Sequence, residues 1–397
     1  MSSRRRVLVV AGYFDWFSGY QETVLVPALA KHADVEVMAS DRVSPAFQDS
    51  HLAALGLKRR YGTGTRWENN ILVARHASFE KRSMVWSTTV RKAIDSGTYD
   101  LIVQVMPGQL LSSAPAFTCN PAPRVALYGD NKAMWSHLPR WKRIAKGGAF
   151  AVSKGLLYTV VNRRSEAIYG YTPDTIRRLR PFQAGRPAHL LPLAFSAETF
   201  HPDDAVRHLY RTELGLSEDD VLLLAAGKIQ PQKRLEWLQE SFEQLAVDHP
   251  RVHLLLVGAD SSDYSERIQQ AFRTSVFRDR MYVRPFTNGA GLNAAFNGAD
   301  LGVWPRNPAI TIQQALGTGL SVLLPRNDLV GHLVRKDSGH YFELREGEEV
   351  ERLAEALKRA LAQTDFSQAA RRTRATNNRW LSADSVARQL LAGTGTP

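Results

Sequence analysis

The chain has 397 residues, of which 44% are hydrophobic and 23% charged, and it contains one cysteine. This length exceeds the roughly 250–300 residues at which one hydrophobic core stops growing, so two domains are expected. The apolar content excludes a mainly disordered or fibrous chain. The lone Cys119 can form neither an internal disulfide nor a four-cysteine zinc site, and a reducing cytoplasm fits it best.

The N-terminus does not predict a secretory signal, because the apolar run Val7–Ala11 is too short for the hydrophobic segment of a signal peptide. The longest uncharged stretch, residues 101–123, is interrupted by polar residues, glycine and proline. A membrane span needs about 20 predominantly apolar residues. The sequence therefore favours a chain that is not integral to a membrane.

The formal net charge of +12 lies entirely in the first half of the chain. Residues 1–190 hold 27 Lys+Arg and 13 Asp+Glu, whereas the remaining residues hold 24 and 26. Such asymmetry indicates an anionic partner, such as a lipid surface, a nucleic acid or a phosphorylated substrate. Solvated surface charge explains it equally well.

Residues 1–190 alternate short apolar strands with helical stretches. Strands are predicted at Val7–Ala11, Val35–Met38, Leu101–Val105 and Val125–Tyr128, with a helix at about Gln21–His32. Strands that alternate with helices predict a parallel sheet with helices on both faces.

The same alternation begins again after a linker near residues 190–204, which predicts a second doubly wound unit. Its strands are predicted at Val221–Ala226, Val252–Val257, Met281–Val283, Leu301–Trp304 and Val322–Leu324. Its helices are predicted at Leu235–Ala246, Leu292–Asn297, Ile312–Leu316 and Val350–Leu361. The fold class is therefore α/β with two doubly wound units, and ligands are expected beyond the carboxyl ends of the strands, in the cleft between the units.

Several well-known sequence motifs for binding nucleotides or metals are missing from this chain. Gly-x-Gly-x-x-Gly follows neither opening strand, which argues against a nicotinamide dehydrogenase, and the absence of Gly-x4-Gly-Lys-Ser/Thr argues against a P-loop ATPase. No Asp-x-Asp motif occurs, and the eleven histidines show no metal-ligand spacing. No metal site is predicted.

The strongest candidate site follows the first strand of the second unit, in the segment AAGKIQPQKRLEWLQESF. Lys228 and Lys233 stand five residues apart across a loop that contains proline, just before a predicted helix. Two ammonium groups at the carboxyl edge of a sheet, beside a helix start, suit a diphosphate. Taken alone, the segment is also compatible with a surface loop that carries two solvated lysines.

In its wider context this segment resembles the G-(R/K)-x-x-x-x-K-(G/R) region of retaining GT-B glycosyltransferases of the family-4 type. HLLLVGAD, MYVRPF, LNAAFNGADLGVWP and IQQALGTGLSVLLP resemble the strands and helices that follow it in that family. LPLAFSAETFHP resembles the family's interdomain linker, and SGYQETVLVPALAKHADVEVMASD its glycine-loop helix and second strand. The resemblance covers most of residues 7–390 in the right order.

The resemblance implies a role for each matching residue. Lys228 and Lys233 would hold the donor diphosphate and stabilise the departing nucleotide without a metal, and Gln314 would hold the ribose. Gly19, with Tyr20 beside it, takes the place of the glycine that the donor phosphates approach. The strand end at Arg284, Pro285 and Phe286 corresponds to the base contact.

The sequence departs from the family pattern at three places. The family usually has E-x7-E in its donor loop, but PRNPAITIQQA is shorter and contains no carboxylate, and Asn307 and Thr311 are the nearest polar substitutes for the glutamate that grips the sugar. Gln314 is a neutral amide where the family has a glutamate. Asp130 ends a strand where the family has a histidine, and it would contact the donor sugar or acceptor, or cap a helix.

Two segments of the first half are candidates for the acceptor side. The loop aromatics Tyr13, Phe14, Trp16 and Phe17 precede Gly19, where rings stack on sugars or dip into lipid, although core packing is the commoner fate of such residues. The basic aromatic stretch Trp135–Lys146 suits an anionic membrane surface, with a solvated helix as the slightly favoured alternative.

We therefore expect a metal-independent, retaining glycosyltransferase that uses a UDP or GDP sugar and an acceptor that the sequence does not name. Residues 1–190 would bind the acceptor and 191–377 the nucleotide sugar, and the last helix, residues 378–397, would pack back on the first domain. A cytoplasmic enzyme without a nucleic-acid partner is expected, with peripheral contact to an anionic membrane as one option. The alternatives are a degenerate, non-catalytic GT-B protein that docks on an anionic partner and a nucleotide-sugar 2-epimerase.

Overall fold

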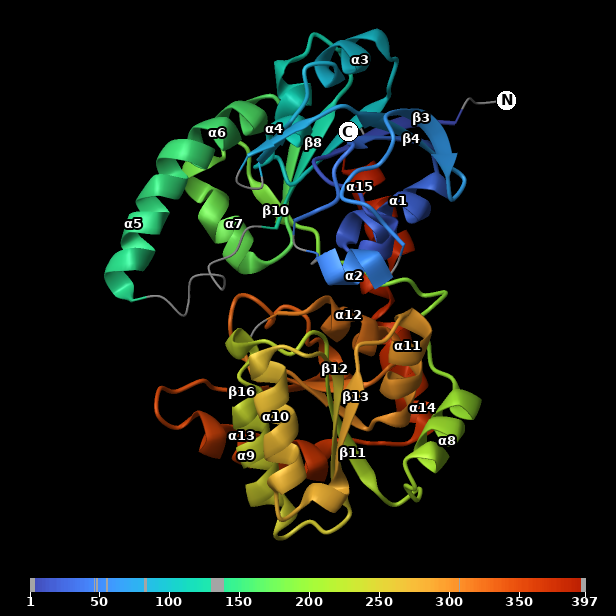
Figure 1. Cartoon of the computed structure of the whole chain (residues 1–397), viewed down its shortest axis with the longest axis vertical. Coiled ribbons are helices and arrows are strands. Elements are labelled where there is room, and N and C mark those ends of the chain that lie inside the picture. Colours follow the sequence, from blue (N-terminus) through green and yellow to red (C-terminus); the bar gives the residue numbers. More distant parts are fainter. Residues whose placement is uncertain are drawn as a thin grey trace. The chain divides into compact units, whose positions relative to one another are not determined.

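The computed structural model describes residues 4–45, 47, 49–54, 56–81, 84–129, 139–306 and 308–393. The chain divides into two compact units (Figure 1). Unit 1 comprises Met1–Pro192 together with Ala383–Pro397, and unit 2 comprises Leu193–Ser382. Among the described residues, no helix has the length and apolar character needed to cross a membrane.

Unit 1 is built on an eight-stranded sheet with the order β10-β9-β8-β7-β1-β2-β4-β3, parallel except for the antiparallel pair β3–β4. Because β1 and β7 are neighbours, the chain builds the sheet outward in both directions from them, so the strand order reverses between these two strands. The strands are β1 (Arg6–Ala11), β2 (Asp34–Ser40), β3 (Gly64–Glu68), β4 (Ile71–His76), β7 (Leu101–Val105), β8 (Arg124–Tyr128), β9 (Ala167–Gly170) and β10 (Ala188–Leu190). A separate hairpin joins β5 (Phe79–Lys81) and β6 (Met84–Trp86).

The helices of unit 1 are α1 (Gln21–Ala30), α2 (Asp49–Ala54), α3 (Val90–Ser96), α4 (Leu110–Ser113), α5 (Arg140–Phe150), α6 (Leu156–Arg163), α7 (Pro173–Leu179) and α15 (Ala383–Ala392). A π-helical turn, Ala151–Gly155, joins α5 to α6. The last helix, α15, packs against α1 (Figure 1). It buries Val386 and Leu390 completely, and Asp384 Oδ1 lies 2.6 Å from His32 Nε2.

Unit 2 contains a fully parallel sheet with the order β13-β12-β11-β14-β15-β16, which is a doubly wound arrangement whose order reverses between β11 and β14. The strands are β11 (Val221–Ala226), β12 (Val252–Ala259), β13 (Met281–Pro285), β14 (Leu301–Val303), β15 (Ser321–Pro325) and β16 (Gly339–Phe342). The helices are α8 (Asp204–Glu213), α9 (Leu235–Ala246), α10 (Asp263–Thr274), α11 (Gly289–Gly298), α12 (Ile310–Gly317), α13 (Glu349–Gln363) and α14 (Gln368–Asn377).

Alternate residues of each strand in unit 2 serve two separate cores, as the pleat of a strand requires. On β11, Leu223 and Ala225 face α9, α10 and α13, whereas Leu222, Leu224 and Ala226 face α11 and α12. Burying both faces explains why β11 is a continuous apolar run in the sequence.

A buried ion network ties α8 to the start of β14. Asp300 Oδ1 accepts from Arg207 at 2.7 Å, and Asp300 Oδ2 accepts from Arg211 at 2.9 Å and from the Leu222 amide at 2.8 Å. All three charged side chains are almost fully buried. A buried charge is tolerated only with such partners, so the network fixes α8 to the amino ends of β11 and β14, the two strands whose carboxyl ends carry the site.

The elements predicted from the sequence are present, with ends that differ by up to two or three residues. Residues 64–86 were not assigned to strands in the sequence prediction, yet they form β3, β4 and the β5–β6 hairpin. The predicted helix at Gln21–His32 ends earlier, at Ala30.

Candidate functional site

The loops after β11 and β14 lie side by side in unit 2, because these two strands are neighbours at the point where the strand order reverses. Ligands of doubly wound sheets bind in the crevice at the carboxyl ends of such strands. The loop after β11 carries Lys228 and Lys233, and the loop after β14 carries Arg306 and leads into α12.

Two glycines allow the lysine loop to fold closely over the sheet. Gly227 has a φ of 106° and Gly258, at the end of β12, has a φ of 123°, which are values that other residues rarely adopt. A Cβ atom on Gly258 would lie 2.6 Å from the Gly227 carbonyl oxygen, and one on Gly227 would lie 2.8 Å from Lys233 Nζ. The ammonium group of Lys233 therefore lies directly against the backbone at the end of β11.

The two predicted lysines differ in their surroundings. Lys228 is exposed, whereas burial lowers the pKa of Lys233 to about 8. Within the described residues, neither ammonium group makes a hydrogen bond or an ion pair with a protein group. Lys228 also acts electrostatically on Asp260, whose pKa it helps to lower. Two cations that are not hydrogen-bonded or ion-paired to the described residues, at the switch point of a doubly wound sheet, can bind an anion such as a diphosphate.

Thr311 connects the donor loop to the same place. Its Oγ1 donates to the Ala226 carbonyl oxygen at 2.9 Å, and Trp304 Nε1 donates to that oxygen at 3.1 Å and to Thr311 Oγ1 at 3.2 Å. Thr311 is 6% exposed. The structure thus places this predicted substrate-binding residue beside Gly227, with its hydroxyl engaged in holding the end of β11.

Arg306 was missed by the sequence reasoning, although it lies in the same site. It lines a small cavity together with Gly227, Lys233 and Trp304. The sequence spacing could have identified this residue. Gln314 corresponds to the second glutamate of the family's E-x7-E motif, so the first glutamate, eight residues earlier, corresponds to position 306. The donor loop is therefore not shorter than the family pattern at this point, and it carries a cation where a carboxylate was expected.

Gln314 lies on α12, one turn beyond Thr311. Its Oε1 is shielded from solvent and has no hydrogen-bond partner among the described residues. The neighbouring Gln313 is buried, and its amide group can donate to the Ala309 and Ile310 carbonyl oxygens. In the described part of the chain, the Gln314 side-chain oxygen therefore lacks the donor that a buried amide oxygen normally has.

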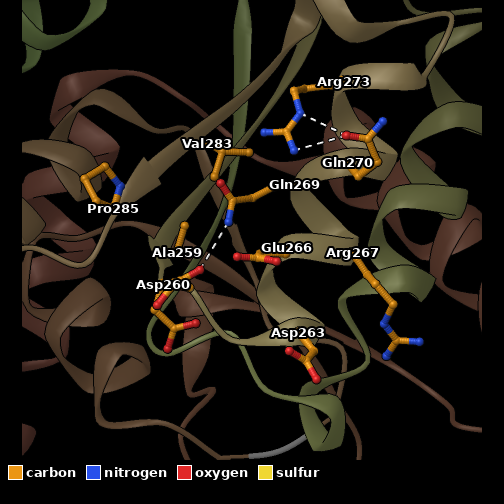
Figure 2. Close-up of a pocket in the computed structure, with 11 residues that line it drawn as sticks. Ala259, Asp260, Asp263, Glu266, Arg267, Gln269, Gln270, Arg273, Val283 and Pro285 are labelled. Carbon is orange, nitrogen blue, oxygen red and sulfur yellow. Dashed lines mark hydrogen bonds between the residues drawn. The ribbon is translucent and has the colours of Figure 1, made fainter. Parts of the chain in front are cut away.

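The predicted base-contacting strand end borders an open groove of about 870 Å³ between the ends of β12 and β13 and helix α10 (Figure 2). Phe286, just beyond β13, is 63% exposed, whereas Arg284 is paired with Glu213 at 2.8 Å. Gln269 on α10 donates to the Asp260 carbonyl oxygen at 3.3 Å across the groove (Figure 2). The groove is lined by both donors and acceptors, which suits a neutral heteroaromatic ring better than a phosphate.

In unit 1 the corresponding switch point lies between β1 and β7. A Cβ atom on Gly12, just after β1, would lie 2.9 Å from the Gln109 side chain, so the loops after the two strands are in contact. Gly19 has a φ of 63°, and a Cβ there would meet open space, so its conformation rather than crowding requires glycine. The following Tyr20 is 45% exposed, and its ring lies 5.9 Å from that of Phe47.

The loop aromatics before Gly19 are held by protein partners. Phe14 is completely buried, so the interpretation of this residue as an acceptor contact is wrong. Trp16 Nε1 donates to Glu68 at 3.0 Å, and the Tyr13 hydroxyl donates to Glu80 at 3.0 Å. A signal for packing was present in the sequence, since aromatic residues in a loop are more often buried than free.

A buried polar network shapes the same loop. Asp15 accepts hydrogen bonds from the Ser44 amide at 3.0 Å and from the Tyr61 hydroxyl at 2.9 Å. The Arg75 guanidinium lies 3.7 Å from the centre of the Tyr61 ring and donates to Glu68 at 2.8 Å. Burial raises the pKa of Asp15, and the hydrogen bonds from Ser44 and Tyr61 oppose that effect.

Two of the predicted site residues, Asp130 and Asn307, lie outside the described residues, as does the beginning of the stretch Trp135–Lys146. In the parts of the chain that the structure does describe, no three His, Cys, Asp or Glu side chains gather closely enough to hold a metal ion.

Residues 220–363 match the family model described as glycosyl transferases group 1. None of the curated proteins matches the chain. Among solved structures, the chain is similar to sucrose-phosphate synthase from Thermosynechococcus elongatus, with 15% identity, a TM-score of 0.67, and coverage of 98% of this chain and 100% of that one. It is also similar to Anabaena HepE in complex with UDP, with 15% identity, a TM-score of 0.69 and 98% coverage of both chains.

A third similar structure is the catalytic domain of starch synthase IV from Arabidopsis thaliana bound to ADP and acarbose, with 10% identity, a TM-score of 0.65 and 99% coverage of both chains. Likeness at such low identity establishes the fold. The chain has the α/β fold of GT-B proteins, with two doubly wound Rossmann-like domains as the sequence predicts, and the match to glycosyl transferases group 1 lies in its second domain.

Proposed function

We propose that the chain is a retaining glycosyltransferase that moves a sugar from a nucleoside diphosphate, UDP or GDP, to an acceptor hydroxyl without a metal. Unit 2 would bind the nucleotide sugar, and unit 1 would bind the acceptor, which is a sugar, a lipid-linked molecule or a small natural product. The observation that carries the proposal is the pair Lys228 and Lys233, which make no hydrogen bond or ion pair with described residues at the switch point of the domain that matches glycosyl transferases group 1.

The lysines would act on the leaving group. Glycosyl transfer leaves negative charge on the distal phosphate, and cations already fixed at that position lower the barrier without reorganisation. Lys233 is the better placed of the two to act in this way, because its ammonium is fixed against the Gly227 backbone and withdrawn from water. Retention would follow if the acceptor attacks the face from which the phosphate leaves, with the leaving phosphate oxygen taking the acceptor proton.

The other contacts with the donor would surround this diphosphate site. Gln314 Oε1 would accept a hydrogen bond from a ribose hydroxyl, and the exposed Phe286 with the groove beside β13 would receive the base. Gly19 and Tyr20 would border the phosphates from unit 1. A catalytic role for Asp130 and a sugar contact for Asn307 remain part of the proposal.

Release of nucleoside diphosphate from UDP and GDP sugars, measured in EDTA with the purified chain and a panel of acceptors, tests this function. Lys228→Ala and Lys233→Ala should each lower turnover by about ten- to a hundredfold, the value of a lost charge-assisted contact. Lys358→Ala is the matched control, because Lys358 is a surface lysine of unit 2 that lies 3.5 Å from Asp248. NMR of the product's anomeric configuration decides between retention and inversion.

Two alternatives make different predictions in the same assay. A degenerate GT-B protein would bind nucleoside diphosphate and release none from any sugar. A 2-epimerase would convert its nucleotide sugar without an acceptor, but it needs carboxylates and histidines lining its site, and the donor loop supplies Arg306 instead.

We further propose that unit 1 makes peripheral contact with an anionic membrane through α5, the turn that follows it and the start of α6. Four apolar side chains there, which we call the apolar stripe, are 66–81% exposed: Trp141, Ile144, Val152 and Leu156. The exposed Lys142 and Lys146 lie on the same helix (Figure 1). Apolar side chains flanked by cations suit the surface of anionic lipids.

Cosedimentation with phosphatidylglycerol and phosphatidylcholine vesicles tests this contact. The chain should bind the anionic vesicles more strongly, and Trp141→Ser with Ile144→Ser should abolish the binding. Val247→Ser with Val276→Ser, which removes two apolar side chains of unit 2 that are 70% and 82% exposed, is the matched control. Equal binding to both kinds of vesicle would contradict the proposal.

A further inference from the structure

Arg306 lies next to the lysine loop that would bind the donor diphosphate in unit 2. It follows β14, the neighbour of β11 at the switch point of unit 2, so it lies beside the loop that carries the two lysines. It lines the same small cavity as Lys233 and Gly227. This cavity has a volume of about 10 Å³ and a mainly apolar lining, so it is too small for a sugar, but it shows that Arg306 and Lys233 lie close together at the end of β11.

The guanidinium group of Arg306 contacts an aromatic ring but makes no hydrogen bond or ion pair with the described residues. Its central carbon lies 5.5 Å from the centre of the Trp237 ring, and the Arg234 guanidinium lies at the same distance from that ring. Within the described part of the chain, no hydrogen bond or ion pair engages Arg306, whereas Arg234 is paired with Glu236 at 3.1 Å. Burial, and then the charge of Arg234, lower the pKa of Arg306, so its surroundings leave the cation incompletely compensated.

The two carboxylates that act electrostatically on Arg306, those of Glu236 and Glu349, have other hydrogen-bond partners. Glu236 is bonded to Arg234 and to the Tyr264 hydroxyl, and Glu349 accepts a hydrogen bond from the Gly347 amide at 3.0 Å. Both carboxylates raise the pKa of Arg306, but each of these effects is smaller than the lowering caused by burial and by the charge of Arg234. The planar fork of Arg306 therefore keeps donors that are available to a ligand.

The residue type at this position decides which sugars suit the site. A carboxylate side chain accepts hydrogen bonds from sugar hydroxyls, as expected of the glutamate that the family resemblance places eight residues before Gln314. A guanidinium group has five N–H donors and no acceptor, and its geometry matches a carboxylate through two parallel hydrogen bonds. Replacing a carboxylate by a guanidinium group reverses the charge that faces the sugar and presents hydrogen-bond donors in place of acceptors.

Resting on the proposed function, we propose that Arg306 is a specificity-determining residue that selects a donor whose glycosyl group carries a carboxylate. The donor would be a nucleoside diphosphate linked to a uronic acid. Lys228 and Lys233 would bind the diphosphate, and Arg306 would bind the sugar carboxylate.

Calorimetric titration of the full chain in EDTA tests the assignment. The uridine series is UDP, UDP-glucose and UDP-glucuronate, and the guanosine series is GDP, GDP-mannose and GDP-mannuronate. In the series whose base fits, the uronate should bind about ten- to a hundredfold more tightly than the neutral sugar, as one charge-assisted pair allows. Arg306→Gln should abolish this preference, and Arg306→Glu should reverse it.

Arg234→Gln is the matched control, because it removes a guanidinium from the same Trp237 ring and should leave the preference intact. Melting temperatures of all variants confirm that each one is folded. If Arg306→Gln weakens the bare nucleoside diphosphate as much as the uronate, Arg306 is a third diphosphate cation and the sugar assignment is wrong. If a diphosphate binds but the uronate has no advantage, only the Arg306 proposal fails; if no diphosphate binds, the proposed function fails as well.

Discussion

The pKa of about 8 for Lys233 makes the affinity for nucleoside diphosphate depend on pH. At pH 7 about nine-tenths of the molecules carry the charged ammonium, and at pH 9 only about one-tenth do. A diphosphate requires the charged form, and the second ionisation of a phosphate, near pH 6, is largely complete by pH 7. Affinity should therefore fall about tenfold between pH 7 and pH 9, which calorimetric titration with UDP and GDP in EDTA would measure.

Lys233→Met should lower the affinity about ten- to a hundredfold at pH 7 and flatten its pH dependence. Lys228→Met is the matched control, since it should also lower the affinity but keep the slope, because Lys233 remains. The ligand-free protein offers a second measurement. Since the unfolded chain binds more protons than the native one between the native pKa of about 8 and the ordinary value near 10.4, stability should rise with pH across this window and should not do so in Lys233→Met.

An affinity that stays constant from pH 7 to pH 9 in the wild-type chain would refute the assignment of Lys233 to the diphosphate. A slope that persists in Lys233→Met would assign the titration to another group.

Three further substitutions test the ribose contact and the hydrogen bonds that hold the strands of unit 2 in place. Gln314→Glu should leave nucleotide affinity unchanged or higher and change stability little, whereas a loss of several kcal/mol with binding intact would show that the amide is a core group rather than a ribose contact. Thr311→Val should cost about 0.5–1.5 kcal/mol in chemical denaturation, because the Ala226 carbonyl oxygen loses its 2.9 Å donor but keeps Trp304 Nε1, and Thr311→Ser should restore most of that loss. Asp300→Ala should cost about 3–5 kcal/mol by leaving Arg211 as a buried charge without its partner, and an unchanged denaturation midpoint would contradict the importance of the network.

The apolar runs of the sequence determine most of the fold. Strands such as Val221–Ala226 and Leu101–Val105 are uninterrupted apolar segments between helical ones, and a strand buried on both faces has no other composition available to it. The prediction missed β4 although this strand is mostly buried and begins with four apolar residues. β3 and the β5–β6 hairpin escaped prediction because β3 is exposed along most of its length and the hairpin strands are three residues long. Neither feature leaves a hydrophobic period to detect.

The sequence by itself also placed Lys228 and Lys233 in one loop at a strand end, because sequence spacing and strand position fix which edge of a parallel sheet a loop occupies. Tertiary structure alone decided what surrounds them. The use of the Thr311 hydroxyl by Ala226 and the approach of Arg306 both depend on β11 and β14 being neighbours, although about 80 residues separate them in the chain. Pairing between distant strands is set by the packing of the whole domain, and no local pattern encodes it.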